Sequence, residues 1–212
     1  MRPVEPTLEA EPAAAAAIAG DRLPVLRRFT QSLAAQGEER GLIGPLELPR
    51  LWTRHVLNSA LVAPLLRPGL VGDVGSGAGL PGLVLGIVRP DVRFVLIEPM
   101  ERRILWLREQ VEVLELENVS VLRARAEEVR LPEPLDQVTA RAVSALSKLI
   151  PLTAPLLRPG GELVLLKGIN AEKEILAAEK VLRRFKVATP EVVVLGDGVL
   201  SEVTRVVRAT VG

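Results

Sequence analysis

The sequence predicts an α/β fold built on a mostly parallel sheet. From residue 69 onward, short apolar segments alternate with longer amphipathic ones, a pattern typical of β-α-β units. A glycine-rich segment, residues 75–82, follows the first apolar segment, and a Gly-Asp-Gly turn separates the last two. The length of 212 residues suits one domain with an extension better than two domains.

Seven strands are expected. The first five are predicted at residues 70–74, 92–98, 119–123, 136–140 and 161–167, with helices between them. The clearest helix covers residues 101–114, because Ile104, Leu107, Val111 and Leu114 recur on one face. Two final strands, 187–195 and 200–209, flank an Asp-Gly turn signal at residues 196–198 and should pair as an antiparallel hairpin. A terminal hairpin after five parallel strands differs from the plain dinucleotide-binding pattern and matches the seven-stranded, Rossmann-like sheet of class I methyltransferases.

The N-terminal third of the chain shows no alternation of strands and helices. Residues 1–20 are rich in Pro, Ala and Glu without a clear period, so we expect a poorly ordered start. Residues 21–68 are expected to form a helical extension with one helix beginning at Asp21 and a second at about 48–66. The main domain is then residues 69–212.

Composition narrows the classes of function. The chain has no cysteine, which excludes disulfides, thiolate nucleophiles and zinc-thiolate sites. No apolar run reaches the roughly 18 residues of a membrane helix, and the acidic N-terminus does not resemble an export signal. We therefore expect a cytoplasmic protein without a membrane partner, and nothing in the sequence demands more than a monomer. Because the net charge is only +1, any RNA would have to be bound by a local basic patch.

The strongest local signal is the segment DVGSGAGLPG, residues 73–82. Its glycines, among them Gly75 and Gly77, let the backbone approach a ligand closely. A lone GxGxxG match is weak, but Asp73 directly before the loop would repel a pyrophosphate and suits the cationic S-adenosylmethionine. Glu98 ends the second strand, where it is placed to accept hydrogen bonds from ribose hydroxyls. The alternative is a plain tight turn with a solvated Glu98.

Several motifs together resemble one family. DVGSGAGLPG, the strand ending at Glu98, RARAEEV (123–129), TARAV (139–143), LLKG (165–168) and RHVLNS (54–59) are similar to the glucose-inhibited division protein B family. Its members are the 16S rRNA (guanine-N7) methyltransferases of small subunit methyltransferase type G. The resemblance implies transfer of a methyl group from S-adenosylmethionine to a guanine N7 in the decoding-centre loop of 16S rRNA, with S-adenosylhomocysteine as product. The partner would be 16S rRNA or the assembled small ribosomal subunit.

Carried over position by position, the resemblance implies donor contacts at Gly75 and Leu80, with Ala126 and Glu127 beside the adenine. Arg141 would lie at the reactive end of the donor. The sequence departs from the family where Asn58 replaces an Asp and where Arg102-Arg103 replaces a Lys-Arg pair.

The implied chemistry suits these residues. Guanine N7 carries a lone pair and no proton, so its methylation needs positioning rather than a general base or a metal. We expect Arg141 to hold the guanine O6 or a phosphate, and the alternative is that it caps a helix or pairs with Glu127. Candidate RNA contacts are Arg54, His55, Arg102, Arg103 and Lys167. The alternative function is a class I methyltransferase that acts on a small molecule or a protein.

Overall fold

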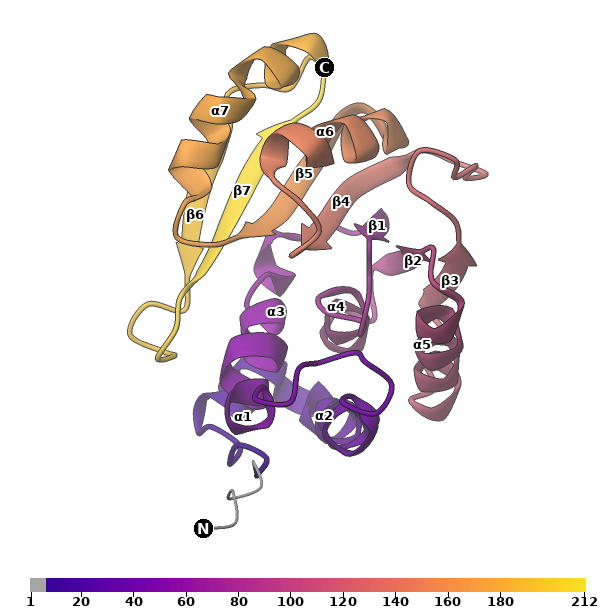
Figure 1. The fold of residues 1–212 in the computed structure, drawn as a ribbon, viewed down its shortest axis with the longest axis vertical. Coiled ribbons are helices and arrows are strands. Elements are labelled where there is room, and N and C mark those ends of the chain that lie inside the picture. The colour runs from indigo at the N-terminus through magenta and orange to yellow at the C-terminus, as the bar shows by residue number, and fades with distance from the viewer. Residues whose placement is uncertain (1–6) are drawn as a thin grey trace.

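A seven-stranded sheet forms the centre of the protein in the computed structural model, which describes residues 7–212 (Figure 1). Its strand order is β3-β2-β1-β4-β5-β7-β6. β1 to β5 pair in parallel, whereas β7 runs antiparallel to both β5 and β6. The strands are β1 (Leu70–Val74), β2 (Arg93–Glu98), β3 (Val119–Arg123), β4 (Leu135–Arg141), β5 (Leu157–Lys167), β6 (Glu191–Leu195) and β7 (Thr204–Thr210). The predicted mostly parallel sheet with a terminal antiparallel hairpin is confirmed.

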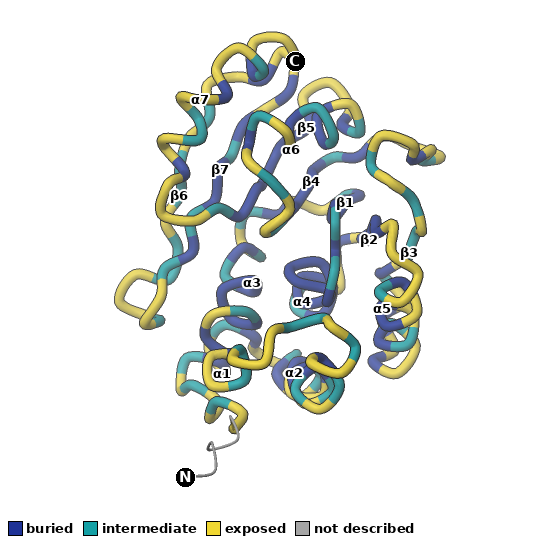
Figure 2. Tube along the Cα trace, in the orientation of Figure 1, coloured by how far each residue is buried: buried dark blue, intermediate teal, exposed yellow. Residues whose placement is uncertain are grey.

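Helices cover both faces of this sheet. α4 (Gly82–Val88) and α5 (Glu101–Val113) lie on one face together with the N-terminal helices, and α6 (Leu146–Thr153) and α7 (Ala171–Arg184) lie on the other (Figure 1). Each face has its own hydrophobic cluster. β1 is therefore buried along its whole length, as expected for a parallel strand with helices on both sides (Figure 2).

The hairpin forms as predicted, but its turn does not. Residues 196–203 connect β6 to β7, so the expected tight turn at residues 196–198 is wrong. The backbone N–H groups of Val199 and Leu200 donate to the carbonyl of Gly196, and Leu200 packs against the hydrophobic cluster that includes the N-terminal helices. Packing of the connection against a segment far away in the sequence thus overrides the local turn signal.

The N-terminal segment is more ordered than its composition predicted. α1 (Ala14–Ala19) lies within residues 1–20, so the expected disorder is wrong for that helix; residues 1–6 lie outside the described part of the chain. Ala15 and Ala19 are buried in the same cluster as Leu26. Short helices gain most of their stability from such tertiary packing rather than from intrinsic propensity.

The second helix of the extension is interrupted. α2 (Leu23–Gln36) confirms the first predicted helix, but residues 48–66 form a 3-10 turn, a π-helix at Leu51–Leu57, the short α3 (Asn58–Ala60) and a further 3-10 turn at Ala63–Leu65. Pro64 cannot donate the backbone hydrogen bond that an α-helix would need at that position, so one regular helix cannot continue to residue 66. The extension shares a hydrophobic cluster with α4 and β2, and the boundary at residue 68 stays a prediction.

No helix in residues 7–212 combines the length and the apolar character needed to span a membrane.

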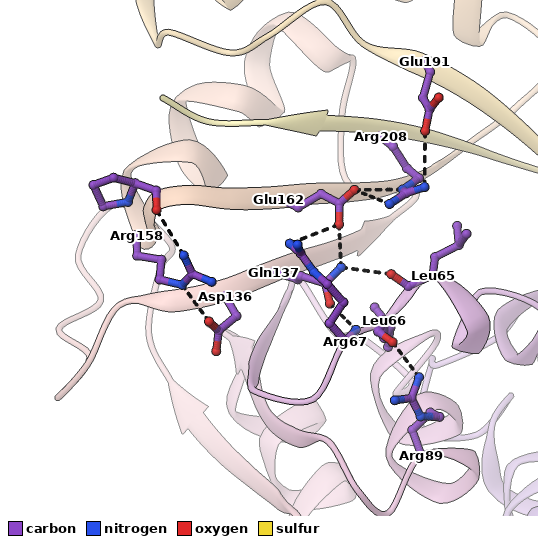
Figure 3. A network of polar contacts seen from close by, with 11 residues as sticks. Leu65, Leu66, Arg67, Arg89, Asp136, Gln137, Arg158, Glu162, Glu191 and Arg208 are labelled. Carbon is purple, nitrogen blue, oxygen red and sulfur yellow. Dashed lines mark hydrogen bonds and ion pairs between the residues drawn. The ribbon is translucent and has the colours of Figure 1, made fainter.

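A polar network joins the extension to the sheet near the beginnings of β1 and β4 (Figure 3). The side chain of Gln137 is fully buried; its Nε2 donates to Glu162 Oε2 at 2.8 Å and to the Leu65 carbonyl at 3.0 Å. Its Oε1 accepts from the Arg67 backbone N–H at 2.7 Å. Arg208 Nε donates to the other oxygen of Glu162 at 2.9 Å. One amide of β4 is therefore bonded both to the end of the extension, at residues 65–67, and to β5.

Replacing Gln137 with Leu should lower the free energy of unfolding by about 3 kcal/mol, because the change leaves a buried N–H, a carbonyl and part of a carboxylate without partners. Chemical denaturation measures this loss. The control is Arg183→Ala, which removes an exposed ion pair to Glu179 and should leave stability nearly unchanged. Equal stability of the two variants would contradict the role given to the network.

Candidate functional site

Asp73 organises the loop at the end of β1. Its side chain is 1% exposed. Oδ1 accepts a hydrogen bond from Thr139 Oγ1 at 2.9 Å, and Oδ2 accepts from the backbone N–H of Gly82 at 3.2 Å. The Ser76 hydroxyl donates to the Asp73 carbonyl at 2.9 Å. The carboxylate thus connects β1, β4 and the beginning of α4, and it is directed into the protein interior.

Burial destabilises the ionised form of the Asp73 carboxyl. Burial raises the pKa of Asp73 to about 6, although hydrogen bonds from Ser76, Thr139 and Gly82 and the charge of Arg141 oppose the rise. Ionising the group near neutral pH therefore opposes folding. Titratable groups with such perturbed pKa values cluster at functional sites.

Two glycines of the loop have backbone conformations that other residues rarely adopt. Gly75 has φ +73° and Gly77 has φ +56°. A Cβ built at Gly75 would lie 2.8 Å from Cγ2 of Val143, whereas at Gly77 only the carbonyl of Gly75 lies within 4 Å. At Gly75 the absence of a side chain therefore lets the loop lie directly against the segment after β4.

Glu98 holds the same loop from β2. Its buried carboxylate accepts from the Gly77 N–H at 2.9 Å and from the Met100 N–H at 3.0 Å, and Arg103 Nη1 lies 3.7 Å from Oε2. Each carboxylate oxygen has two lone pairs. Glu98 can therefore hold the loop and still accept a further hydrogen bond from a ligand.

A cavity of about 350 Å³ lies beside this loop, and we call it the loop cavity. Of the residues predicted to contact the donor, five line it: Gly75, Glu98, Ala126, Glu127 and Arg141. Asp73, Gly77 and Leu80 do not. Leu80 has its side chain in the hydrophobic core, and a donor contact through its backbone stays a prediction.

A second, larger cavity of about 880 Å³ lies at the ends of β4 and β5, and we call it the basic cavity. Arg54, His55, Arg141 and Lys167 line it, as do Asn58 and Arg205, which were not predicted as RNA contacts. Of the two arginines that were also expected to contact RNA, Arg103 lines the loop cavity instead, and Arg102 lines neither.

The two cavities meet at three consecutive residues, Arg141, Ala142 and Val143, which line both. Ala142 has φ +55°, a conformation uncommon for residues other than glycine. Non-glycine residues held in that region often occur at functional sites. Ala142 falls within the TARAV segment, but alanine carries no preference for this conformation, so the conformation was not predicted.

Arg141 does not pair with Glu127, which was one alternative expected from the sequence. Its Nη2 lies 3.0 Å from His55 Nδ1, and its Nη1 donates to the carbonyl of Arg54 at 3.3 Å. Burial lowers the pKa of Arg141 to about 10, so the guanidinium remains charged at neutral pH. Two of its five N–H groups are used in these contacts.

Two other cations of the basic cavity, Arg54 and Lys167, are paired with acids. Arg54 Nη1 lies 3.2 Å from Glu202, and Lys167 Nζ lies 2.8 Å from Glu174 while donating to the Ser144 carbonyl at 2.7 Å. An RNA phosphate at these positions would have to compete with the carboxylates.

His55 is the single histidine of the chain, and both its ring nitrogens have partners. Nε2 lies 2.5 Å from Glu47 Oε2, and Nδ1 faces Arg141. Glu47 comes from the segment before the π-helix and was not predicted as a site residue. Its sequence neighbourhood contains no motif that could have identified it.

Among residues 7–212, no three or more His, Asp or Glu side chains are grouped so that they could hold a metal ion.

The buried carboxyl of Asp73 predicts a specific pH dependence. Because its folded pKa lies above the ordinary value of 3.8, its cost to stability appears as the pH rises through about 6. The stability of Asp73→Asn relative to the wild type should therefore increase by about 2 kcal/mol between pH 4 and pH 7.5. Urea unfolding at both pH values measures the difference, and a difference independent of pH would contradict the raised pKa.

Comparison with solved structures shows the fold. A methyltransferase from Aquifex aeolicus, described as SAM dependent, superposes with a TM-score of 0.54 at 22% identity, covering 70% of this chain and 85% of that one. The M. jannaschii protein TYW2, solved in complex with AdoMet, gives a TM-score of 0.58 at 18% identity over 76% of both chains. The architecture is that of class I S-adenosylmethionine-dependent methyltransferases.

Comparison with protein families and curated sequences shows the family. Residues 22–201 match the family model described as rRNA small subunit methyltransferase G. Proteins named ribosomal RNA small subunit methyltransferase G from Leifsonia xyli and Clavibacter michiganensis are 72% and 67% identical to this chain. The alignments cover 97% and 96% of this chain and 98% and 97% of those proteins. With this match over nearly its whole length, the chain belongs to the rRNA small subunit methyltransferase G family.

Proposed function

We propose that this protein transfers a methyl group from S-adenosylmethionine to the N7 of a guanine in the decoding-centre loop of 16S rRNA. The family places the chain among small-subunit rRNA methyltransferases. The observation that carries the proposal is the meeting of two cavities at residues 141–143, one beside a glycine-rich loop and one lined by cations. Such an arrangement suits a reaction between two bound molecules.

The loop cavity fits the methyl donor. When bound, S-adenosylmethionine supplies an electrophilic methyl group on a sulfonium centre. Glu98 would accept hydrogen bonds from the ribose hydroxyls, and Ala126 and Glu127 would lie beside the adenine. Gly75 would let the backbone approach the donor without a side chain in the way. We assign Asp73 to holding the loop rather than to contacting the donor, because its carboxylate points into the interior.

The basic cavity fits the base that accepts the methyl group. Its volume of about 880 Å³ lies in the range of small-molecule sites, and enzymes that modify a base commonly take it out of the stack into such a pocket. Arg141 retains three unused N–H groups, which can donate to guanine O6. Adenine presents a donor at the equivalent position, so this contact favours guanine.

The residues at the boundary of the cavities suit a reaction without proton transfer. Guanine N7 uses its own lone pair, so the protein has to align nucleophile, methyl group and sulfur. We assign Arg141 to that alignment and to no role as an acid or a base. Arg54, His55 and Lys167 would contact the RNA around the target nucleotide, together with Arg205, and we keep Arg102 as a more distant candidate.

We further propose that the protein acts as a cytoplasmic monomer and that no metal takes part. The substrate would be 16S rRNA or the small subunit, which places the enzyme in the compartment where ribosomes are assembled.

The test is methyl transfer from labelled S-adenosylmethionine to small subunits that lack the modification, followed by mapping of the labelled base. Label at one guanine N7 of 16S rRNA is the expected result. Subunits that already carry the modification serve as the control and should take up no label. Donor binding without any label on rRNA would overturn the proposal and favour a small-molecule or protein substrate.

A glycine substitution tests the donor site separately. Gly75→Val should weaken the binding of S-adenosylhomocysteine by at least about tenfold, or 1.4 kcal/mol, because its side chain meets Val143 at the edge of the loop cavity. Isothermal titration calorimetry measures the dissociation constant.

The matched control is Gly198→Val. Gly198 has a similar φ of +69°, but a Cβ there meets nothing within 4 Å. Both variants therefore carry a similar backbone strain, and only Gly75→Val alters the cavity. Equal affinity in the two variants would exclude the loop cavity as the donor site.

A further inference from the structure

We propose that His55, oriented by Glu47, is a positioning residue that fixes the guanidinium of Arg141 at the boundary between the two cavities. The inference rests on the proposed function, in which Arg141 aligns the guanine. It assigns a task in the reaction to the N-terminal extension, which lies outside the predicted main domain.

The hydrogen-bonding chemistry allows one arrangement of protons. A guanidinium only donates, so His55 Nδ1, at 3.0 Å from Arg141 Nη2, has to be the acceptor. The remaining ring nitrogen then carries the proton and donates to Glu47 Oε2. His55 is therefore neutral, in the tautomer protonated at Nε2.

Glu47 is ionised, as it has to be to accept the proton of His55 Nε2. Arg50 donates to both carboxylate oxygens of Glu47, at 2.6 and 3.0 Å. These bonds, together with the bond from His55, lower the pKa of Glu47 to about 2 despite partial burial. The group is thus a carboxylate throughout the physiological range and accepts the His55 proton.

The backbone around His55 is also unusual. Arg54 and His55 lie in the π-helix at Leu51–Leu57, and such helices are rare and frequent at functional sites. The same turn supplies both contacts of Arg141: the ring of His55 and the carbonyl of Arg54. The Ser59 hydroxyl, donating to the His55 carbonyl at 2.6 Å, further fixes the turn.

The contact of His55 with Glu47 and Arg141 is shielded from solvent. The side chains of His55 and Glu47 are only 15% and 20% exposed. Without His55, the Arg141 side chain would keep only its longer bond to the Arg54 carbonyl, at 3.3 Å, and its orientation would be less well defined. A displacement of about 1 Å at a reacting centre can lower a rate about 100-fold.

The arrangement predicts an acid limb in the pH profile. Burial lowers the pKa of His55, and the charges of Arg141 and Arg54 act in the same direction, while Glu47 opposes them. Protonation of His55 would place an N–H against the N–H groups of Arg141. Activity should therefore fall as the pH drops below the ordinary histidine pKa of about 6.5 and approaches the lowered value.

The first experiment compares His55→Phe with His55→Gln in the methylation of small subunits. Phe removes both hydrogen bonds and should lower kcat/KM about 100-fold, mainly through kcat. Gln can accept from Arg141 and donate to Glu47, so it should recover much of the activity and lose the acid limb. If the limb persists in His55→Gln, it belongs to another group, such as Asp73, and the pH part of the inference is wrong.

A double-mutant cycle tests whether His55 acts through Arg141. In an Arg141→Ala background, His55→Phe should change kcat/KM by less than about threefold, since the group it positions is gone. An undiminished effect in that background would overturn the proposal. Activity of His55→Phe within threefold of the wild type would do the same.

The matched control is Thr53→Val, in the same π-helix. Thr53 is buried, and its backbone N–H donates to Glu9 at 2.9 Å, as does its hydroxyl, so its side-chain hydrogen bond goes to neither Arg141 nor His55. This variant should lower the melting temperature and leave the pH profile and kcat unchanged. An equal loss of kcat in Thr53→Val would mean that His55 only stabilises the helix.

A measurement without activity separates this inference from the proposed function. Because His55 is the single histidine, ¹⁵N-histidine labelling gives one pair of ring signals in NMR. We expect a protonated Nε2 and an unprotonated Nδ1, with the Nδ1 signal shifting in Arg141→Ala. The opposite tautomer would overturn the inference even if rRNA is methylated, and the expected tautomer would support the contact even if rRNA is not.

Discussion

The candidate site depends on a carboxylate that the protein buries at the end of β1. Asp73 joins β1 to β4 through Thr139 and to the beginning of α4 through Gly82, so the glycine loop between them has its two ends fixed. Glu98 fixes the middle of the loop through Gly77. Hydrogen bonds from the interior thus replace the water that these acids lose and hold the loop at both ends and in the middle.

The sheet places Arg141 at the site, and the N-terminal extension orients its guanidinium. Parallel strands end at one edge, and this topology places Arg141 beside the loop. It does not determine the direction of the guanidinium, which is set by His55 and the Arg54 carbonyl from the π-helix. The extension and the sheet also share one hydrophobic cluster and the polar network around Gln137. Extension and sheet are therefore linked at both ends of β4, and a disturbance of their packing reaches the site.

The sequence predicted those features that local patterns encode. The bounds of β1 and β3 follow from short apolar runs, and the loop follows from its glycines. The elements that were missed depend on long-range packing: α1 is ordered by burial of its alanines, and the hairpin connection by Leu200 against the N-terminal helices. At the site, the family motifs pointed to Arg141 and His55. Arg141 and His55 are 86 residues apart in the sequence, and His55 and Glu47 are 8 apart. No local sequence pattern predicts contacts over such separations.

A net charge of +1 is compatible with an RNA substrate because of how the cations of the basic cavity are paired. Arg54 and Glu202 form a pair whose side chains are both nearly half exposed, and an exposed pair contributes at most about 1 kcal/mol. Exchanging such a carboxylate for an RNA phosphate costs little, whereas the buried partners of Arg141 would be costly to displace. The cavity therefore combines a replaceable ion pair at Arg54 with a guanidinium held in place at Arg141. Under the proposed function, Arg54 would adapt to the RNA backbone while the position of the reacting base stays defined.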